Sequence, residues 1–156
     1  MMQPIVLKLL LFTSSEAADR ERSEKSLLLF LEGLSRHNQA LLAQYKYPRL
    51  YEARVRYLRE EGTEEWLDIP HVIQAGWGDC EDLACWRVAE LRRDGYAASP
   101  FVKFRYVGGA FRYHVLVEYW DAAKKRFEED PSRRLGMGWE TDFARRYPWA
   151  REREAA

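Results

Sequence analysis

The chain contains two cysteines and three histidines, the side chains best suited to nucleophilic and base chemistry. Cys80 lies in the segment GWGDCEDLACWRVAELRRDGY, where Asp79 can cap a helix that runs from about Cys80 to Arg93 and exits at Gly95. A helix N-terminus carries about half a positive charge, which stabilises a thiolate. The sequence therefore predicts a nucleophilic thiol at a helix start.

Cys80 also begins the inward face of that helix, a stripe that continues through Ala84, Val88 and Leu91. Cys85 points to another side, so no disulfide is expected between the two cysteines, and its interpretation is a small buried hydrophobe. The sequence has no CxxC motif, which argues against a structural zinc site.

His114 is the histidine best placed to act as the base. His37 falls in an early helical region and His71 follows Pro70 in an irregular segment, whereas His114 lies within a predicted strand. A turn centred near Ala122 would place the next strand opposite it. The resulting pairs are Glu118 with Arg126, Val117 with Phe127, and His114 with Asp130.

The first two pairs support this register, because opposite charges and apolar side chains stabilise cross-strand neighbours. A carboxylate beside an imidazole fixes its tautomer and stabilises the imidazolium that forms when it accepts a proton. The predicted triad is therefore Cys80, His114 and Asp130.

Helices and strands must position these residues. Leucines at helical spacing predict one or two helices over about 15–45, with Gly33 as the candidate break. An irregular segment over 45–70, with a short helical piece around 50–61, is expected to wall a cleft.

After the nucleophile helix the period changes to two. Strands are predicted over 101–107 and 111–120, joined at Gly108-Gly109, and a third strand ends at Pro131. Helices followed by an antiparallel meander indicate an α+β fold.

Composition limits the class of protein. A chain of 156 residues that is 47% hydrophobic and 32% charged is expected to form one soluble domain. Its net charge of zero argues against a nucleic-acid partner.

The opening MMQPIVLKLLLF is too short and too interrupted for a membrane span, and an opening strand or buried turn is preferred over a cleaved signal. The arginine-rich end, from Arg133 onward, is interpreted as a solvated tail.

The strings Gly78-Asp79-Cys80-Glu81-Asp82-Leu83-Ala84, Tyr113-His114-Val115 and Asp130-Pro131-Ser132 resemble the transglutaminase-like cysteine peptidase superfamily. The resemblance covers a catalytic core of about 66–137 and implies a papain-like fold. It carries the roles of nucleophile, base and orienting residue onto Cys80, His114 and Asp130. Short proteins with this arrangement resemble bacterial and bacteriophage members.

Two further assignments follow from the resemblance. Papain-like proteases have an oxyanion glutamine at the offset of Gln74, and the indoles of Trp66 or Trp77 are alternatives that would also shape the cleft. In the related periplasmic proteases, acidic residues beside the cysteine bind calcium, which would make Asp79 and Glu81 ligands. Helix capping is the preferred interpretation, because calcium takes about 6 to 8 oxygens and only two are named.

The expected function is hydrolysis of a peptide or amide through a thioester on Cys80, with a protein or peptide substrate and no required cofactor. A transglutaminase or glutamine deamidase is one alternative. A binding or virion assembly module without activity is the other. A cytoplasmic or virion-associated location is preferred over secretion.

Overall fold

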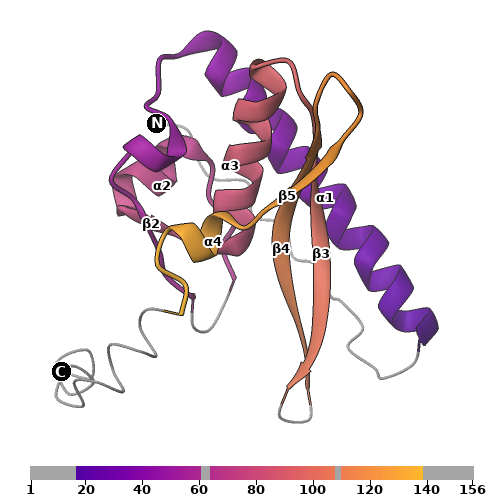
Figure 1. Cartoon of the computed structure of the whole chain (residues 1–156). Coiled ribbons are helices and arrows are strands. Elements are labelled where there is room, and N and C mark those ends of the chain that lie inside the picture. Colours follow the sequence, from indigo (N-terminus) through magenta and orange to yellow (C-terminus); the bar gives the residue numbers. More distant parts are fainter. Residues whose placement is uncertain (1–16, 61–63, 108–109, 139–156) are drawn as a thin grey trace, which may run out of the picture.

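The computed structural model describes residues 17–60, 64–107 and 110–138 (Figure 1). The helices are α1 (Ala17–Gln44), α2 (Ile69–Ala75), α3 (Cys80–Arg93) and α4 (Pro131–Arg134), with a 3-10 turn η1 (Leu50–Glu52). The strands are β1 (Arg56–Tyr57), β2 (Trp77–Gly78), β3 (Ala97–Val107), β4 (Ala110–Trp120) and β5 (Arg126–Glu129). This mixture of helices and small sheets confirms the α+β class.

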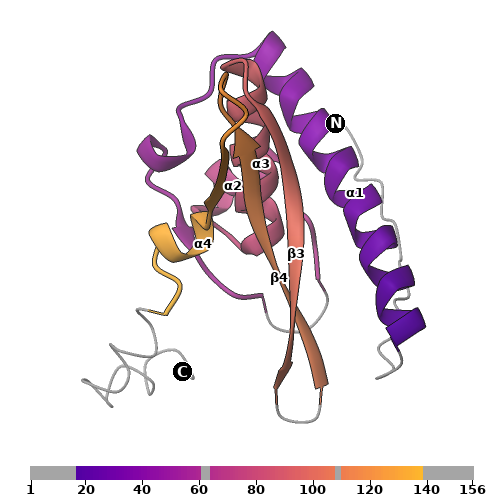
Figure 2. The same ribbon diagram turned by 45° about the vertical axis from the view of Figure 1, so that its right-hand side comes forward.

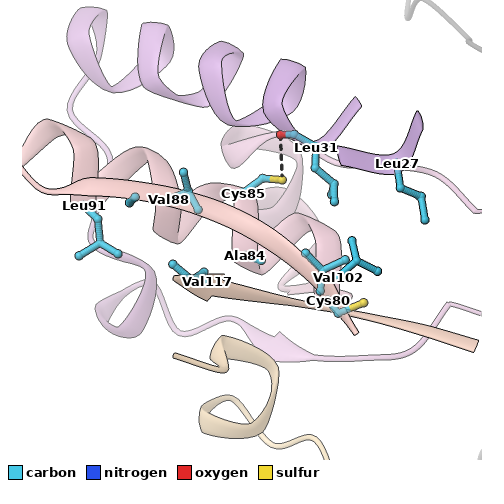
Figure 3. Close-up of a cluster of buried hydrophobic side chains, with 11 residues drawn as sticks. Leu27, Leu31, Cys80, Ala84, Cys85, Val88, Leu91, Val102 and Val117 are labelled. Carbon is cyan, nitrogen blue, oxygen red and sulfur yellow. Dashed lines mark hydrogen bonds between the residues drawn. The ribbon is translucent and has the colours of Figure 1, made fainter. Parts of the chain in front are cut away.

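Helix α3 is the centre of the fold, because two groups of buried side chains meet on its opposite sides. One group joins α3 to α1 and to strands β3 and β4 (Figure 3). It contains the predicted stripe of Cys80, Ala84, Val88 and Leu91, which is therefore confirmed. The second group joins α3 to α2 and η1 around the fully buried Trp86. Burial on both sides fixes the position of Cys80.

Strands β3, β4 and β5 form an antiparallel sheet in that order, as the alternating pattern predicted. The β3–β4 hairpin extends past the lower end of α3 in both views (Figures 1 and 2). Strand β5 is much shorter than β4 and pairs with it only from Val117 to Trp120. The lower half of β4 consequently has no described strand on that side.

The predicted register between β4 and β5 was wrong by two residues. Glu118 lies opposite Glu128 and Tyr119 opposite Phe127, so Arg126 reaches Glu118 only diagonally, at 2.9 Å. The reason is the turn, in which Asp121 N–H donates to Lys125 O and Lys124 adopts φ 61°. A residue in the left-handed region lengthens such a turn and moves its centre. An even shift leaves each side chain on its predicted face.

Other expectations can be checked in the described ranges. Helix α1 runs without a break through Gly33, and of the short helical piece over 50–61 only η1 forms. The parallel pair β1–β2 was not predicted. The opening residues, the Gly108-Gly109 turn and the arginine-rich end beyond 138 lie outside the described residues. Where the chain is described, none of its helices has the length and apolar character needed to cross a bilayer.

Candidate active site

Cys80 is the first residue of α3, and a network of acceptors holds the chain around it. Asp79 is the N-cap residue, as predicted, and its N–H donates to Asp82 Oδ2 at 3.1 Å. Asp82 Oδ1 also accepts the N–H of Leu67 at 2.6 Å. A Cβ on Gly78 would lie 3.1 Å from the Asp82 Cβ, a tight contact that the missing side chain of glycine avoids. The helix start is therefore held by contacts from both sides.

The Cys80 thiol lies between Glu81 and strand β4. Its Sγ donates to Glu81 Oε2 at 3.0 Å, and Val115 of β4 packs in the same buried group as the cysteine. The cysteine is only 9% exposed. Burial and the Glu81 carboxylate raise the pKa of Cys80 well above its usual value, and the Val115 N–H opposes them only in part. The expected thiolate-stabilising effect of the helix N-terminus is therefore outweighed.

Val115 and His114 lie on opposite faces of β4. Side chains alternate along a strand, so Val115 faces α3 while His114 faces the other side, next to Lys103. Cys80 packs on the Val115 side, in the buried group that contains both residues.

His114 and Asp130 are in direct contact, which confirms the predicted pairing in spite of the register error. His114 Nε2 lies 2.9 Å from Asp130 Oδ2. Asp130 follows β5 and caps α4, so its Oδ1 accepts the N–H of Arg133 at 3.1 Å. Burial would raise the pKa of Asp130, but the hydrogen bonds from His114 and Arg133 hold that pKa below its usual value.

The carboxylate selects the tautomer of the imidazole. With Asp130 ionised, His114 Nε2 is the donor in this contact, and Nδ1 carries the lone pair of the neutral ring. Within the described residues, no hydrogen bond joins this imidazole to the Cys80 thiol. The structure therefore shows a His–Asp pair that joins β4 to the start of α4, and a separately bonded thiol at the start of α3.

Glu81 is the unexpected member of the site. It is 1% exposed, and besides the thiol it accepts the Tyr113 hydroxyl at 3.1 Å on Oε1. The same hydroxyl lies 2.7 Å from Oε2 of the exposed Glu64. Burial together with the two carboxylates raises the pKa of Tyr113, and burial raises that of Glu64. The hydrogen-bonding groups of Cys80, Glu81, Tyr113 and Glu64 thus form a series from the buried thiol to the surface.

Two more buried carboxyl groups surround the helix start. Burial, followed by the like charges of Asp82 and Glu81, raises the pKa of Asp79, and burial raises that of Asp82. Asp79 Oδ1 is buried without a hydrogen-bond partner. Such pKa values indicate that the native protein keeps a proton on this carboxyl pair near neutral pH.

The calcium alternative receives no support from this arrangement. Both oxygens of Glu81 accept hydrogen bonds from side chains of the chain itself. Across the described ranges, no group of three or more His, Cys, Asp or Glu side chains is arranged to hold a metal ion. We therefore assign Asp79 to the helix cap and Glu81 to the thiol contact.

The proposed cleft residues have different surroundings. Trp66 packs against the buried group that contains Cys80 and meets Phe30 edge to face at 6.5 Å. Trp77 is half-buried in β2. Gln74 is exposed near the end of α2, and no hydrogen bond links its amide to a described residue of the site. Of the three, Trp66 is the one shown to lie against this cluster.

Glu81, Tyr113 and Val115 are the site residues whose contacts the sequence did not predict. Tyr113 and Val115 flank His114, and Glu81 flanks Cys80, so adjacency was the available signal. Glu81 had been interpreted as a residue that complements the helix dipole, which assumes exposure. Its complete burial follows from the closure of β4 over the helix start, a contact between residues far apart in sequence.

Comparisons with protein-family models, with curated proteins and with solved structures found no match for this chain.

Proposed function

We propose that this chain is a cysteine-dependent acyl-transfer enzyme with a papain-like, transglutaminase-like core, most simply a peptidase or amide hydrolase. Cys80 is the nucleophile, His114 the base and Asp130 the residue that orients it. One observation carries the proposal: Cys80 packs with Val115 in one buried group, and the adjacent His114 is bonded to Asp130 at 2.9 Å. The motif resemblance around the three residues supports the same roles.

The proposed reaction begins with transfer of the thiol proton to His114 Nδ1. The sulfur attacks the carbonyl carbon of a peptide or amide, and the developing oxyanion accepts the backbone N–H of Cys80 at the helix start. The C–N bond then breaks, the imidazolium protonates the departing amine, and a thioester remains. Water, deprotonated by His114, attacks this thioester, which releases the acid and returns the proton to sulfur.

Hydrolysis is proposed over amine transfer because it needs no second substrate besides water. The alternative is a transglutaminase or glutamine deamidase, which would share every residue of this mechanism. Release of ammonia and incorporation of an amine, assayed on mixed protein substrates, distinguish these activities from cleavage of the main chain.

A module without catalytic activity is favoured by a different observation. The thiol is almost fully buried and donates to a carboxylate, and its pKa is raised. A protein that only binds a partner, in the cytoplasm or in a virion, would need nothing more of this cysteine than packing.

Thiol labelling separates an enzyme from such a module. Cys80 is alkylated with iodoacetamide near neutral pH, and the modified site is located by peptide mapping. We expect His114→Ala to slow alkylation by about 100-fold, the effect typical of losing a general base. Cys80→Ala should abolish labelling at this position, and Asp130→Ala should slow it to a smaller extent.

The matched control is His71→Ala, because His71 also bonds an aspartate, Asp68, but lies on α2. This control should leave the alkylation rate unchanged. If His114→Ala behaves like His71→Ala, the enzymatic proposal is wrong.

A further inference from the structure

Glu81 is a buried carboxylate whose two oxygens are both committed to the site. Oε2 accepts the Cys80 thiol at 3.0 Å and Oε1 accepts the Tyr113 hydroxyl at 3.1 Å. The described residues give it no arginine or lysine as an ion-pair partner. A carboxylate at 1% exposure without such a cation is costly to bury, so its position calls for a specific role.

The thiol has a single proton, so it cannot donate to Glu81 and to His114 at the same time. In the structure it donates to Glu81. The acidic groups that act on the thiol include Asp79 and Glu81, and Arg59 acts on the neighbouring Tyr57. No ion pair among the described residues brings a cation to Glu81, so a thiolate would form beside an unpaired carboxylate.

We propose that Glu81 is the resting-state partner of the Cys80 thiol, which competes with His114 for the S–H proton and keeps the nucleophile inactive until this hydrogen bond is released. The inference rests on the proposed function, since it assumes that Cys80 is a nucleophile. The proposal assigns a restraining role to Glu81, in addition to the catalytic roles proposed for Cys80, His114 and Asp130.

Tyr113 connects this restraint to the surface. Its hydroxyl has one proton and two acceptors, the buried Glu81 and the exposed Glu64, with the shorter distance to Glu64. When the hydroxyl donates to Glu64, the thiol is the main donor left to Glu81. A substrate that reaches Glu64 from solvent can therefore alter the contact between Glu81 and the nucleophile without touching either.

The test compares two variants that remove the negative charge and preserve volume: Glu81→Gln, which keeps one acceptor oxygen, and Glu81→Met, which keeps none. Both should raise the rate of Cys80 alkylation at pH 7.5 by at least about tenfold, equivalent to lowering the apparent pKa of the thiol by about one unit. A pH profile of the rate measures this shift directly. A rate that is unchanged or lower in the folded variants overturns the proposal.

Glu90→Gln is the matched control, because Glu90 is equally buried on the same helix but bonds Arg87 and Leu50 N–H instead of the thiol. It should leave the alkylation rate unchanged, and an increase equal to that of Glu81→Gln would overturn the proposal. A calcium-dependent rate in the wild type that Glu81→Gln abolishes would also overturn it, because Glu81 would then be a metal ligand.

The outcome is separable from that of the proposed function. If Glu81→Gln accelerates alkylation while His114→Ala has no effect in either background, the restraint exists and the base role of His114 fails. If His114→Ala slows alkylation while both Glu81 variants react like the wild type, the triad stands and the restraint is wrong.

Discussion

The two ends of α3 bury carboxylates in opposite ways. At the C-terminal end, Glu90 is 1% exposed and accepts Arg87 Nη1 at 3.1 Å and the Leu50 N–H at 2.7 Å. At the N-terminal end, Glu81 is equally buried but accepts a thiol and a phenol. A buried carboxylate that is paired with a cation, such as Glu90, helps to hold a structure in place. Buried carboxylates without a cation, such as Glu81, are more often found at sites that need shifted pKa values. The comparison separates the structural end of the helix from its chemical end.

The largest expected effect lies at the structural end. Arg87→Met should lower the free energy of unfolding by about 3 kcal/mol, because it leaves a buried carboxylate uncompensated. Arg87 also donates through Nε to Glu129 Oε1 at 2.8 Å, so a second carboxylate loses its partner. Urea unfolding followed by circular dichroism measures the change.

The control for this prediction is Arg36→Met, since Arg36 is exposed and bonds Glu32 within the same helix. It should change the free energy of unfolding by no more than about 0.5 kcal/mol. Equal losses of unfolding free energy in Arg87→Met and Arg36→Met would show that the buried Arg87 pairs stabilise the protein no more than an exposed pair does.

A smaller effect, with a defined pH dependence, is expected at the chemical end. The pKa values of Asp79 and Asp82 are raised in the folded state, so the native protein holds protons that the unfolded chain releases above about pH 4. Stability from these groups is therefore complete at low pH and is lost as pH rises. The wild type should lose unfolding free energy between pH 5 and pH 8, at about 1.4 kcal/mol per pH unit or less while one proton is retained.

Asp79→Asn should reduce this slope, because asparagine caps a helix as well as aspartate does and cannot ionise. Urea unfolding at the two pH values gives both slopes. A variant with the slope of the wild type would mean that Asp79 ionises normally, and the contrast between the two ends would disappear.

The smallest effect should come from the exposed pair that closes the structural end. Arg49 binds Asp94 through two hydrogen bonds of 2.8 and 3.0 Å, but its side chain is 45% exposed. Arg49→Ala should cost less than about 1 kcal/mol, and 1 M salt should reduce that difference further. A larger, salt-independent loss in urea unfolding would place this pair with the buried Arg87 contacts.

Local patterns were sufficient to predict the elements that carry Cys80 and His114. The capping residue Asp79, the apolar stripe of α3 and the alternation in β4 each act over a few residues, and all three predictions were confirmed. The contact between His114 and Asp130 was also predicted, although from a register that was two residues off. The contact forms in spite of this error for two reasons. A register error of two residues leaves each side chain on its predicted face, and Asp130 lies just beyond the end of β5.

Longer-range features could not be read from the sequence. Lys124 adopts the left-handed backbone conformation that glycine or asparagine usually indicates in a sequence, and neither residue is at this position. The burial of Glu81 depends on Tyr113, which lies on another element. The anchoring of Asp82 by Leu67 N–H likewise joins a loop to the helix start. These contacts arise from tertiary packing, which outweighs local preference.

The shortness of β5 has a consequence for how this chain can tolerate insertions. Pro131 has no N–H and ends the strand by its covalent structure, so Asp130 occupies a fixed place relative to it. One residue added to the turn over 121–125 would move β5 out of register and turn Asp130 to the opposite face. Two added residues would instead carry it about 6.6 Å along β4, away from His114. The length of this turn is therefore as much a part of the site as any of its side chains.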